Sequence, residues 1–151
     1  GNPMVLMGDF NNTLADGVLS HLLTNSLRFA SSIDCDAYLA KYCLNDAWNL
    51  FQLALSDEEH VINDVNEIDE TAIEVNRKET LTRAPTHYYG GSGSVFDYIL
   101  LSCEFDASYQ DSIFQVSAYD TYNRHLINPI FDRDGESTDH GVVLVTLTLR
   151  S

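Results

Sequence analysis

Three short apolar runs, at residues 3–7, 95–101 and 142–149, set the main limits on how this chain can fold. The first is continuous and stops abruptly at a polar turn, which is typical of a strand buried on both faces. The last alternates Val, Leu and Thr, as strands do. Helical apolar spacing fills much of the chain between the runs. The sequence therefore predicts one domain of mixed strands and helices, in the α/β or α+β class.

Helical patterns dominate between the first two runs. Leucines and valines at helical spacing predict a helix over 14–29, and a second is expected over about 36–43. Residues 45–46 break this pattern before an apolar stripe that begins at Ala47. The strongly acidic segment 57–79 keeps one apolar face, which indicates a surface helix with a buried side.

The rest of the chain reads as strands and loops. Residues 90–93 are a Gly/Ser turn, and the buried strand predicted over 95–101 carries a single acid, Asp97. A short strand is expected at 113–116, and 117–138 is rich in loop-forming residues. An acid in an otherwise apolar strand needs a partner, so Asp97 is the anomaly of this region.

Composition narrows the possible partners. The 151 residues contain 8 Lys+Arg and 23 Asp+Glu, a formal net charge of −15. Proteins that grip duplex DNA by its phosphates need clustered basic residues, and only Arg77 and Lys78 are adjacent here. No apolar run approaches the roughly 20 residues of a membrane span. Unaided duplex binding and a spanning segment are therefore not expected.

The three cysteines, Cys35, Cys43 and Cys103, include no CxxC pair and leave one thiol over in any disulfide scheme. They indicate neither a zinc cluster nor a disulfide framework, and three ordinary buried thiols are the expectation. No multi-histidine cluster stands out in the sequence either. A bound ion is thus expected to be hard, namely Mg²⁺, Mn²⁺ or Ca²⁺ with oxygen ligands.

Polar groups gather where the three predicted strands begin or end. Asp9 and Asn11 follow the first run, Asp97 lies in the second, and Asp139 and His140 precede the last. Each has an ordinary explanation, since an Asp after a strand often caps a turn or helix and a His can be part of the core. If the strands are neighbours, however, these groups meet, and such a set suits metal-assisted hydrolysis.

Three segments carry a more specific resemblance. Met-Gly-Asp-Phe-Asn (7–11), Phe-Asp-Tyr-Ile-Leu-Leu-Ser (96–102) and Ser-Thr-Asp-His (137–140) resemble, in order, the last three motifs of the endonuclease/exonuclease/phosphatase superfamily. Residues 44–48 and 86–88 are similar to two further elements of that family. The resemblance spans nearly all of the chain, but it covers only the C-terminal half of the family's domain.

The resemblance implies a fold and its limits. The family has a four-layer α/β/β/α sandwich made of two similar halves, so residues 1–151 would form a single partial domain, half of that sandwich. That half would be a mixed, mainly antiparallel sheet with helices on one face. The missing N-terminal half would carry an Asn, the principal metal-binding Glu and a further His.

The resemblance also implies roles for the residues. Asp9 would orient or deprotonate the attacking water and, with Asp139, bind the divalent metal. Asn11 would hold a phosphate oxygen, and His140 would contact the phosphate and transfer protons. Asp97 would fix the His140 tautomer as a carboxylate–imidazole pair. We therefore predict a direct Asp97–His140 contact and convergence of the set at one edge of a sheet.

Other residues are read more plainly. Thr138 stands where the family commonly has Ser, a departure that keeps the hydroxyl. Trp48, Tyr88 and Tyr98 are expected in the core, and His125 is expected at the surface. There is no G-x-S-x-G elbow, so acyl hydrolysis by a Ser/His/Asp set is a distant alternative.

The resulting functional hypothesis is a divalent-metal-dependent phosphoesterase, a nuclease or phosphatase that hydrolyses phosphodiesters or phosphomonoesters by direct attack of water. The alternative is a non-catalytic association module that keeps the fold. Because half of the site would be missing, the chain alone is expected to be nearly inactive. Its inner sheet face is expected to be covered by the missing N-terminal half or by a second copy in a homodimer.

Overall fold

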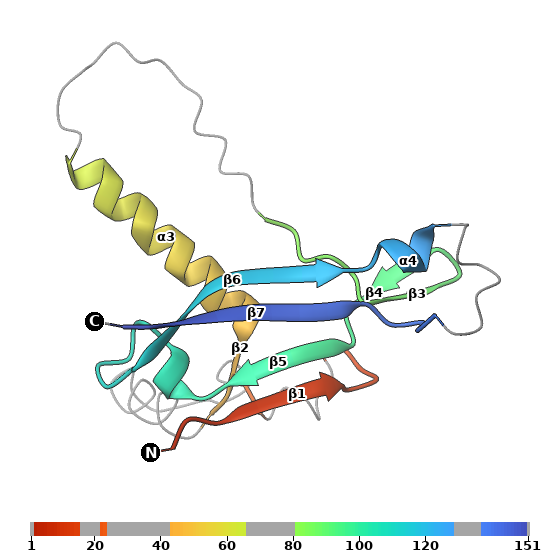
Figure 1. Ribbon diagram of the computed structural model, residues 1–151, viewed down its shortest axis with the longest axis horizontal. Coiled ribbons are helices and arrows are strands. Elements are labelled where there is room, and N and C mark those ends of the chain that lie inside the picture. The colour runs from red at the N-terminus through yellow and green to blue at the C-terminus, as the bar shows by residue number, and fades with distance from the viewer. Residues whose placement is uncertain (1, 16–21, 24–42, 66–80, 129–136, 151) are drawn as a thin grey trace, which may run out of the picture.

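The computed structural model describes residues 2–15, 22–23, 43–65, 81–128 and 137–150, with the backbone alone for 57–65. The fold is mixed α+β with mainly antiparallel strands, as predicted (Figure 1). The strands are β1 (Val5–Asp9), β2 (Asn45–Asp46), β3 (His87–Tyr89), β4 (Ser92–Ser94), β5 (Asp97–Leu101), β6 (Phe114–Tyr122) and β7 (Val142–Leu149). The helical elements are α3 (Ala47–Val65), a 3-10 turn (Cys103–Phe105) and α4 (Arg124–Ile127).

Strand pairing defines the frame that holds the site. A three-stranded sheet has the order β1-β5-β2, and β1 runs antiparallel to β5 with Asp9 opposite Asp97. β6 and β7 form a second antiparallel pair, and β7 lies beside β5 (Figure 1). A tight hairpin joins β3 to β4 through Gly90 and Gly91, whose φ angles of 56° and 84° suit glycine in a hairpin turn.

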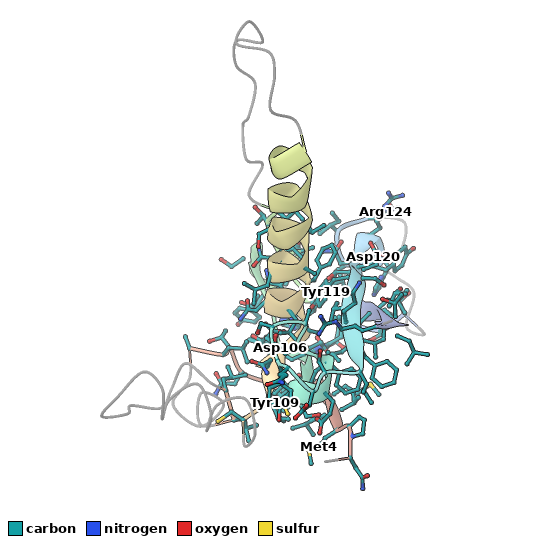
Figure 2. The ribbon with its side chains drawn as sticks, turned by 90° about the vertical axis from the view of Figure 1, so that its left-hand side faces the viewer. Met4, Asp106, Tyr109, Tyr119, Asp120 and Arg124 are labelled. Atoms are coloured by element: carbon teal, nitrogen blue, oxygen red, sulfur yellow. The ribbon has the colours of Figure 1, made fainter. Side chains whose placement is uncertain are left out.

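The core lies between α3 and the strands. Ala47 and Leu50 of α3 are buried against Val116 and Tyr119 of β6, with Leu101 of β5 in the same cluster. Figure 2 shows Tyr119 on the side of β6 that faces α3, where its ring meets Trp48 edge-on at 5.1 Å. A second, smaller cluster joins Leu23, Tyr98 and Leu100. Trp48 and Tyr98 thus pack as expected, and Tyr88 is half-buried.

Several predicted elements are confirmed. β7 spans residues 142–149, residues 45–46 form the short strand β2 rather than helix, and α3 begins at Ala47. Cys43 and Cys103 are buried, as expected, whereas Cys35 lies outside the described residues. Among the described residues no helix is long and apolar enough to cross a membrane.

Other expectations were wrong. β1 is exposed along its whole length rather than buried on both faces, because it is the edge strand of its sheet and Met7 is 68% exposed. β6 extends from Phe114 to Tyr122, so the predicted strand was too short and 117–122 is not loop. A bulge at Ser117 breaks the alternation that would have revealed the strand.

The predicted helices can be tested only in part. Most of the one over 14–29 lies outside the described residues, although Leu23 forms an isolated parallel bridge with Leu44 instead of a helical turn. The helix predicted over 36–43 is also outside, except that Cys43 is not helical. The acidic segment is helical as far as Val65, and its remaining residues, 66–79, lie outside the described residues.

Candidate active site at the strand ends

The antiparallel topology brings the predicted groups to one end of the strands. β1 ends at Asp9, β5 begins at Asp97, and His140 lies two residues before β7. Because β1 and β5 run in opposite directions while β5 and β7 run the same way, the three positions lie at the same end (Figure 1). Ligand atoms of Asp9, Asp97 and His140 all lie within 4.8 Å of one another. The convergence of these three residues is therefore as predicted.

Asp97 and His140 form the predicted pair. The His140 Nδ1 atom lies 2.8 Å from Asp97 Oδ2. An ionised carboxylate only accepts hydrogen bonds, so Nδ1 carries the proton and donates it. This hydrogen bond to Asp97 raises the pKa of His140, although partial burial opposes the rise. The side chains of Asp97 and His140 are 17% and 22% exposed, so the pair lies at an accessible edge.

Asp9 faces the other ring nitrogen of His140. Its Oδ2 lies 3.8 Å from Nε2, too far for a hydrogen bond but close enough for a charge interaction. Its Oδ1 accepts the backbone N–H of Asn11 at 2.8 Å, so one oxygen of Asp9 is held by its own turn. Asn11 has a φ of 51°, in the left-handed region, which Asn tolerates better than most residues. The backbone of Asn11 is therefore fixed next to Asp9.

A buried threonine fixes the register of these groups. Thr86 is fully buried, and its hydroxyl accepts the backbone N–H groups of Phe96 at 3.0 Å and Asp97 at 3.2 Å. Its carbonyl accepts the N–H of Gly141 at 2.6 Å. Thr86 therefore links the start of β5, which carries Asp97, to the segment that carries His140. The sequence pointed to this residue only through the family resemblance.

The segment before β7 is held from several sides. The Thr138 hydroxyl accepts the backbone N–H of His140 at 3.1 Å, a bond that the Ser-to-Thr departure preserves. His125 donates from Nε2 to the His140 carbonyl at 2.9 Å, so this half-buried histidine is not a plain surface residue as predicted. Gly141 is buried, and a Cβ there would lie 3.3 Å from Thr86 Cα, which explains glycine at this close approach.

His87 is a site residue that the sequence reasoning did not single out. It lies on β3, and its ring centroid is 5.0 Å from that of His140. Ligand atoms of His87, Asp139 and His140 all lie within 4.8 Å of one another. The expectation that the chain has no multi-histidine cluster was therefore wrong. The backbone hydrogen bond from Gly141 to Thr86 joins the segments that carry two histidines 53 positions apart. Only the Thr-His-Tyr match at 86–88 gave a signal for this residue.

The two residues expected to bind a metal fall in different groups. Asp9 belongs with Asp97, and Asp139 belongs with His87, while His140 is common to both groups. Asp9 and Asp139 are both exposed, so a hard cation and its water ligands could reach either carboxylate. The carboxylate oxygens of Asp9 and Asp97 suit an ion that prefers oxygen ligands, although Asp97 already accepts a hydrogen bond from His140.

Comparisons with protein-family models, with curated proteins and with solved structures returned no match for this chain.

Proposed function

We propose that the chain carries part of the site of a divalent-metal-dependent phosphoesterase, a nuclease or phosphatase of the family that its motifs resemble. The observation that supports this most is the Asp97–His140 pair with Asp9 beside the second ring nitrogen. This arrangement aligns an orienting carboxylate, an imidazole and a further carboxylate around one accessible space. General acid–base chemistry on a water molecule and a leaving oxygen needs such a set.

The roles follow from which atoms are already engaged. His140 Nδ1 is bound to Asp97, so proton transfer to or from a substrate would use Nε2. Asp9 keeps Oδ2 on the side of that nitrogen, where it can orient or deprotonate an attacking water. Asn11, two residues on, would hold a phosphate oxygen. Asp97 is a positioning residue, since it acts on the substrate only through the imidazole.

A divalent cation completes the proposal. Asp9 and Asp139 would hold Mg²⁺, or Mn²⁺ or Ca²⁺, through their carboxylate oxygens. The ion would supply Lewis-acid stabilisation of the negative charge that develops on the phosphate in the transition state. The chain needs such help, because its net charge of −15 repels a phosphate substrate. The substrate is a phosphodiester or phosphomonoester, whether nucleic acid or small molecule.

The exposed sheet face supports the half-domain proposal. On β7, Val143 and Val145 pack against the α3 core, whereas Val142 and Leu144 are 57% and 61% exposed on the other face. The other half of a two-half domain, or a second copy of this chain, would cover these residues. Solution mass by sedimentation tests this, because a strict monomer with robust turnover contradicts it.

The functional test is hydrolysis of a chromogenic phosphodiester by the purified chain in Mg²⁺ or Mn²⁺. We expect slow hydrolysis above the buffer rate that falls to background in His140→Gln and Asp9→Asn. Asp111→Asn, an exposed carboxylate in the loop after the 3-10 turn, is the matched control and should hydrolyse as the wild type does. Equal rates for wild type and His140→Gln would refute the proposal, and so would hydrolysis that persists after chelation of the metal.

A further inference from the structure

A second set of ligands lies beside the proposed catalytic pair. His87 comes from β3, and Asp139 and His140 come from the segment before β7. Their ligand atoms lie within 4.8 Å of one another, and the set offers two imidazoles and one carboxylate. The geometry points to a binding site for a borderline first-row transition-metal ion, Zn²⁺ above all, at His87, Asp139 and His140. Imidazole ligands suit Zn²⁺, whereas Mg²⁺ prefers an all-oxygen shell.

The hydrogen bond of His140 decides which nitrogen would bind the ion. Nδ1 donates to Asp97 at 2.8 Å, so the lone pair of a neutral ring lies on Nε2. Metal-binding histidines in proteins commonly donate their other N–H to a carboxylate, which orients the ring and increases its basicity. Asp97 already accepts the Nδ1–H hydrogen bond of His140 in this way. The pair that positions the ring is therefore in place without the ion.

His87 is held independently of His140. β3 pairs with β4, and the His87 backbone lies opposite Ser94. The His87 ring stacks on Phe96, with centroids 5.4 Å apart and planes at 28°. The centroids of this ring and the His140 ring lie 5.0 Å apart, and their planes are tilted by 42°. Two imidazoles anchored on separate elements leave only a small rearrangement for metal binding.

The spacing fits a small ion after a modest movement. Zn²⁺ bonds of about 2.0–2.1 Å to N and O imply tetrahedral ligand spacings of about 3.4 Å. The three ligand atoms would therefore close in by about 1 Å or slightly more from their present limit of 4.8 Å. Asp139 is exposed, so its carboxylate can swing at little cost. Three protein ligands leave a fourth position for water, as in zinc sites that are open to substrates.

Zn²⁺ and the proposed proton transfer would use the same nitrogen. An ion on His140 Nε2 removes the lone pair or proton that the phosphoester reaction needs. Zn²⁺ is therefore expected to inhibit hydrolysis in Mg²⁺, and this one consequence rests on the proposed function. The binding site itself does not, since it can be measured without any substrate.

The experiment is calorimetric titration of the purified chain with Zn²⁺ alone and with Mg²⁺ alone. We expect Zn²⁺ to bind one-to-one and more tightly than Mg²⁺. His87→Ala and Asp139→Asn should weaken binding by more than the roughly 10–100-fold that loss of an outer-shell partner costs, and Asp97→Asn should fall within that range. Asp111→Asn is the control for an exposed carboxylate outside the set.

A spectroscopic readout identifies the ligands. In histidine-selective NMR spectra, Zn²⁺ should shift the ring signals of His87 and His140. Bound Co²⁺ should show d–d bands without a thiolate charge-transfer band, because the set contains no sulfur. Asp139→Asn keeps the test valid if His87→Ala fails to fold, since Asp139 is exposed. Unchanged Zn²⁺ affinity in both variants, or a thiolate band, would overturn the inference.

Discussion

Two carboxylates of the three-stranded sheet, Asp46 and Asp97, each pair with a basic side chain from outside the sheet, and the two pairs differ in how far they are buried. Asp46 of β2 pairs with Arg83, and their side chains are 2% and 13% exposed. Asp97 of β5 pairs with His140, at 17% and 22%. Arg83 also donates to the Tyr119 hydroxyl at 2.6 Å. The first pair is enclosed, whereas the second opens to solvent beside Asp9.

The difference distinguishes a structural pair from a candidate active site. The Arg83 guanidinium lies over the rings of Tyr98 and Tyr119, at 4.8 Å and 5.3 Å from their centroids. Burial raises the pKa of Asp46, and Arg83 opposes that rise. The pair thus ties the segment before β3 to the start of α3. His140, in contrast, can gain and lose a proton near neutral pH and keeps Nε2 on the side of Asp9.

The largest expected effect comes from breaking the enclosed pair. Arg83→Met leaves the buried Asp46 carboxylate without its cation, and we expect the free energy of unfolding to fall by about 3–5 kcal/mol in urea denaturation. Arg124→Met is the matched control, because Arg124 is exposed on α4 (Figure 2), and its effect should stay within about 0.5 kcal/mol. Equal losses in the two variants would remove the distinction between an enclosed pair and an open one.

A smaller loss is expected at the residue that aligns the open pair. Thr86→Val removes the acceptor of two backbone N–H groups in a buried place, at an expected cost of about 1–3 kcal/mol in unfolding free energy. Thr86→Ser keeps the hydroxyl and should recover much of this loss. Thr148→Val, exposed on β7, controls for the substitution itself. If Thr86→Val is as stable as Thr148→Val, the hydroxyl does not hold the start of β5.

Asp97→Asn is expected to change stability least, but it should change the pKa of His140 most. Loss of the carboxylate should lower the pKa of His140, read by NMR titration in the presence of a chelator. Asp9→Asn should lower it less, since Asp9 is 3.8 Å away rather than 2.8 Å. Asp111→Asn should leave it unchanged. A larger effect from Asp9 than from Asp97 would contradict the assignment of Asp97 as the positioning residue.

The same pair makes stability depend on pH. The folded-state pKa of His140 is raised above the unfolded value of about 6.5. Its contribution to stability is therefore fully present below about pH 6.5 and is lost as pH rises through the folded-state value. Asp97→Asn should abolish this part of the pH dependence. Urea denaturation of the wild type and of this variant across that window measures the difference.

The sequence indicated most of the site residues but few of the contacts that hold them in place. A charged residue in an apolar strand is costly unless paired, so the pattern indicated that Asp97 needs a partner, and the family resemblance indicated His140. The hydroxyl of Thr86 and the His125 contact could not, because each joins segments far apart in the chain. His87 was overlooked for the same reason, since its neighbour His140 comes from another element.

The fold shows the same division. The alternating apolar pattern at 142–149 predicted β7 with its correct bounds, because a strand's period of two is local. The predicted extent of β6 was too short because a bulge interrupts its alternating pattern, and the bulge is recognised only from the pairing with β7. The exposure of β1 was also missed, since an apolar run does not reveal whether its strand lies at the edge of a sheet.

By itself, then, the sequence determined the class of the fold, the places where chemistry-bearing residues meet strands, and the pairing of Asp97 with His140. Tertiary structure alone decided which strand is an edge, that Asp46 and Arg83 are enclosed, and that His87 lies beside His140. Periodicity and the cost of an unpaired charge act on neighbouring residues and can be read along a chain. Burial and ligand geometry depend on contacts between distant segments, which exist only once the strands have paired.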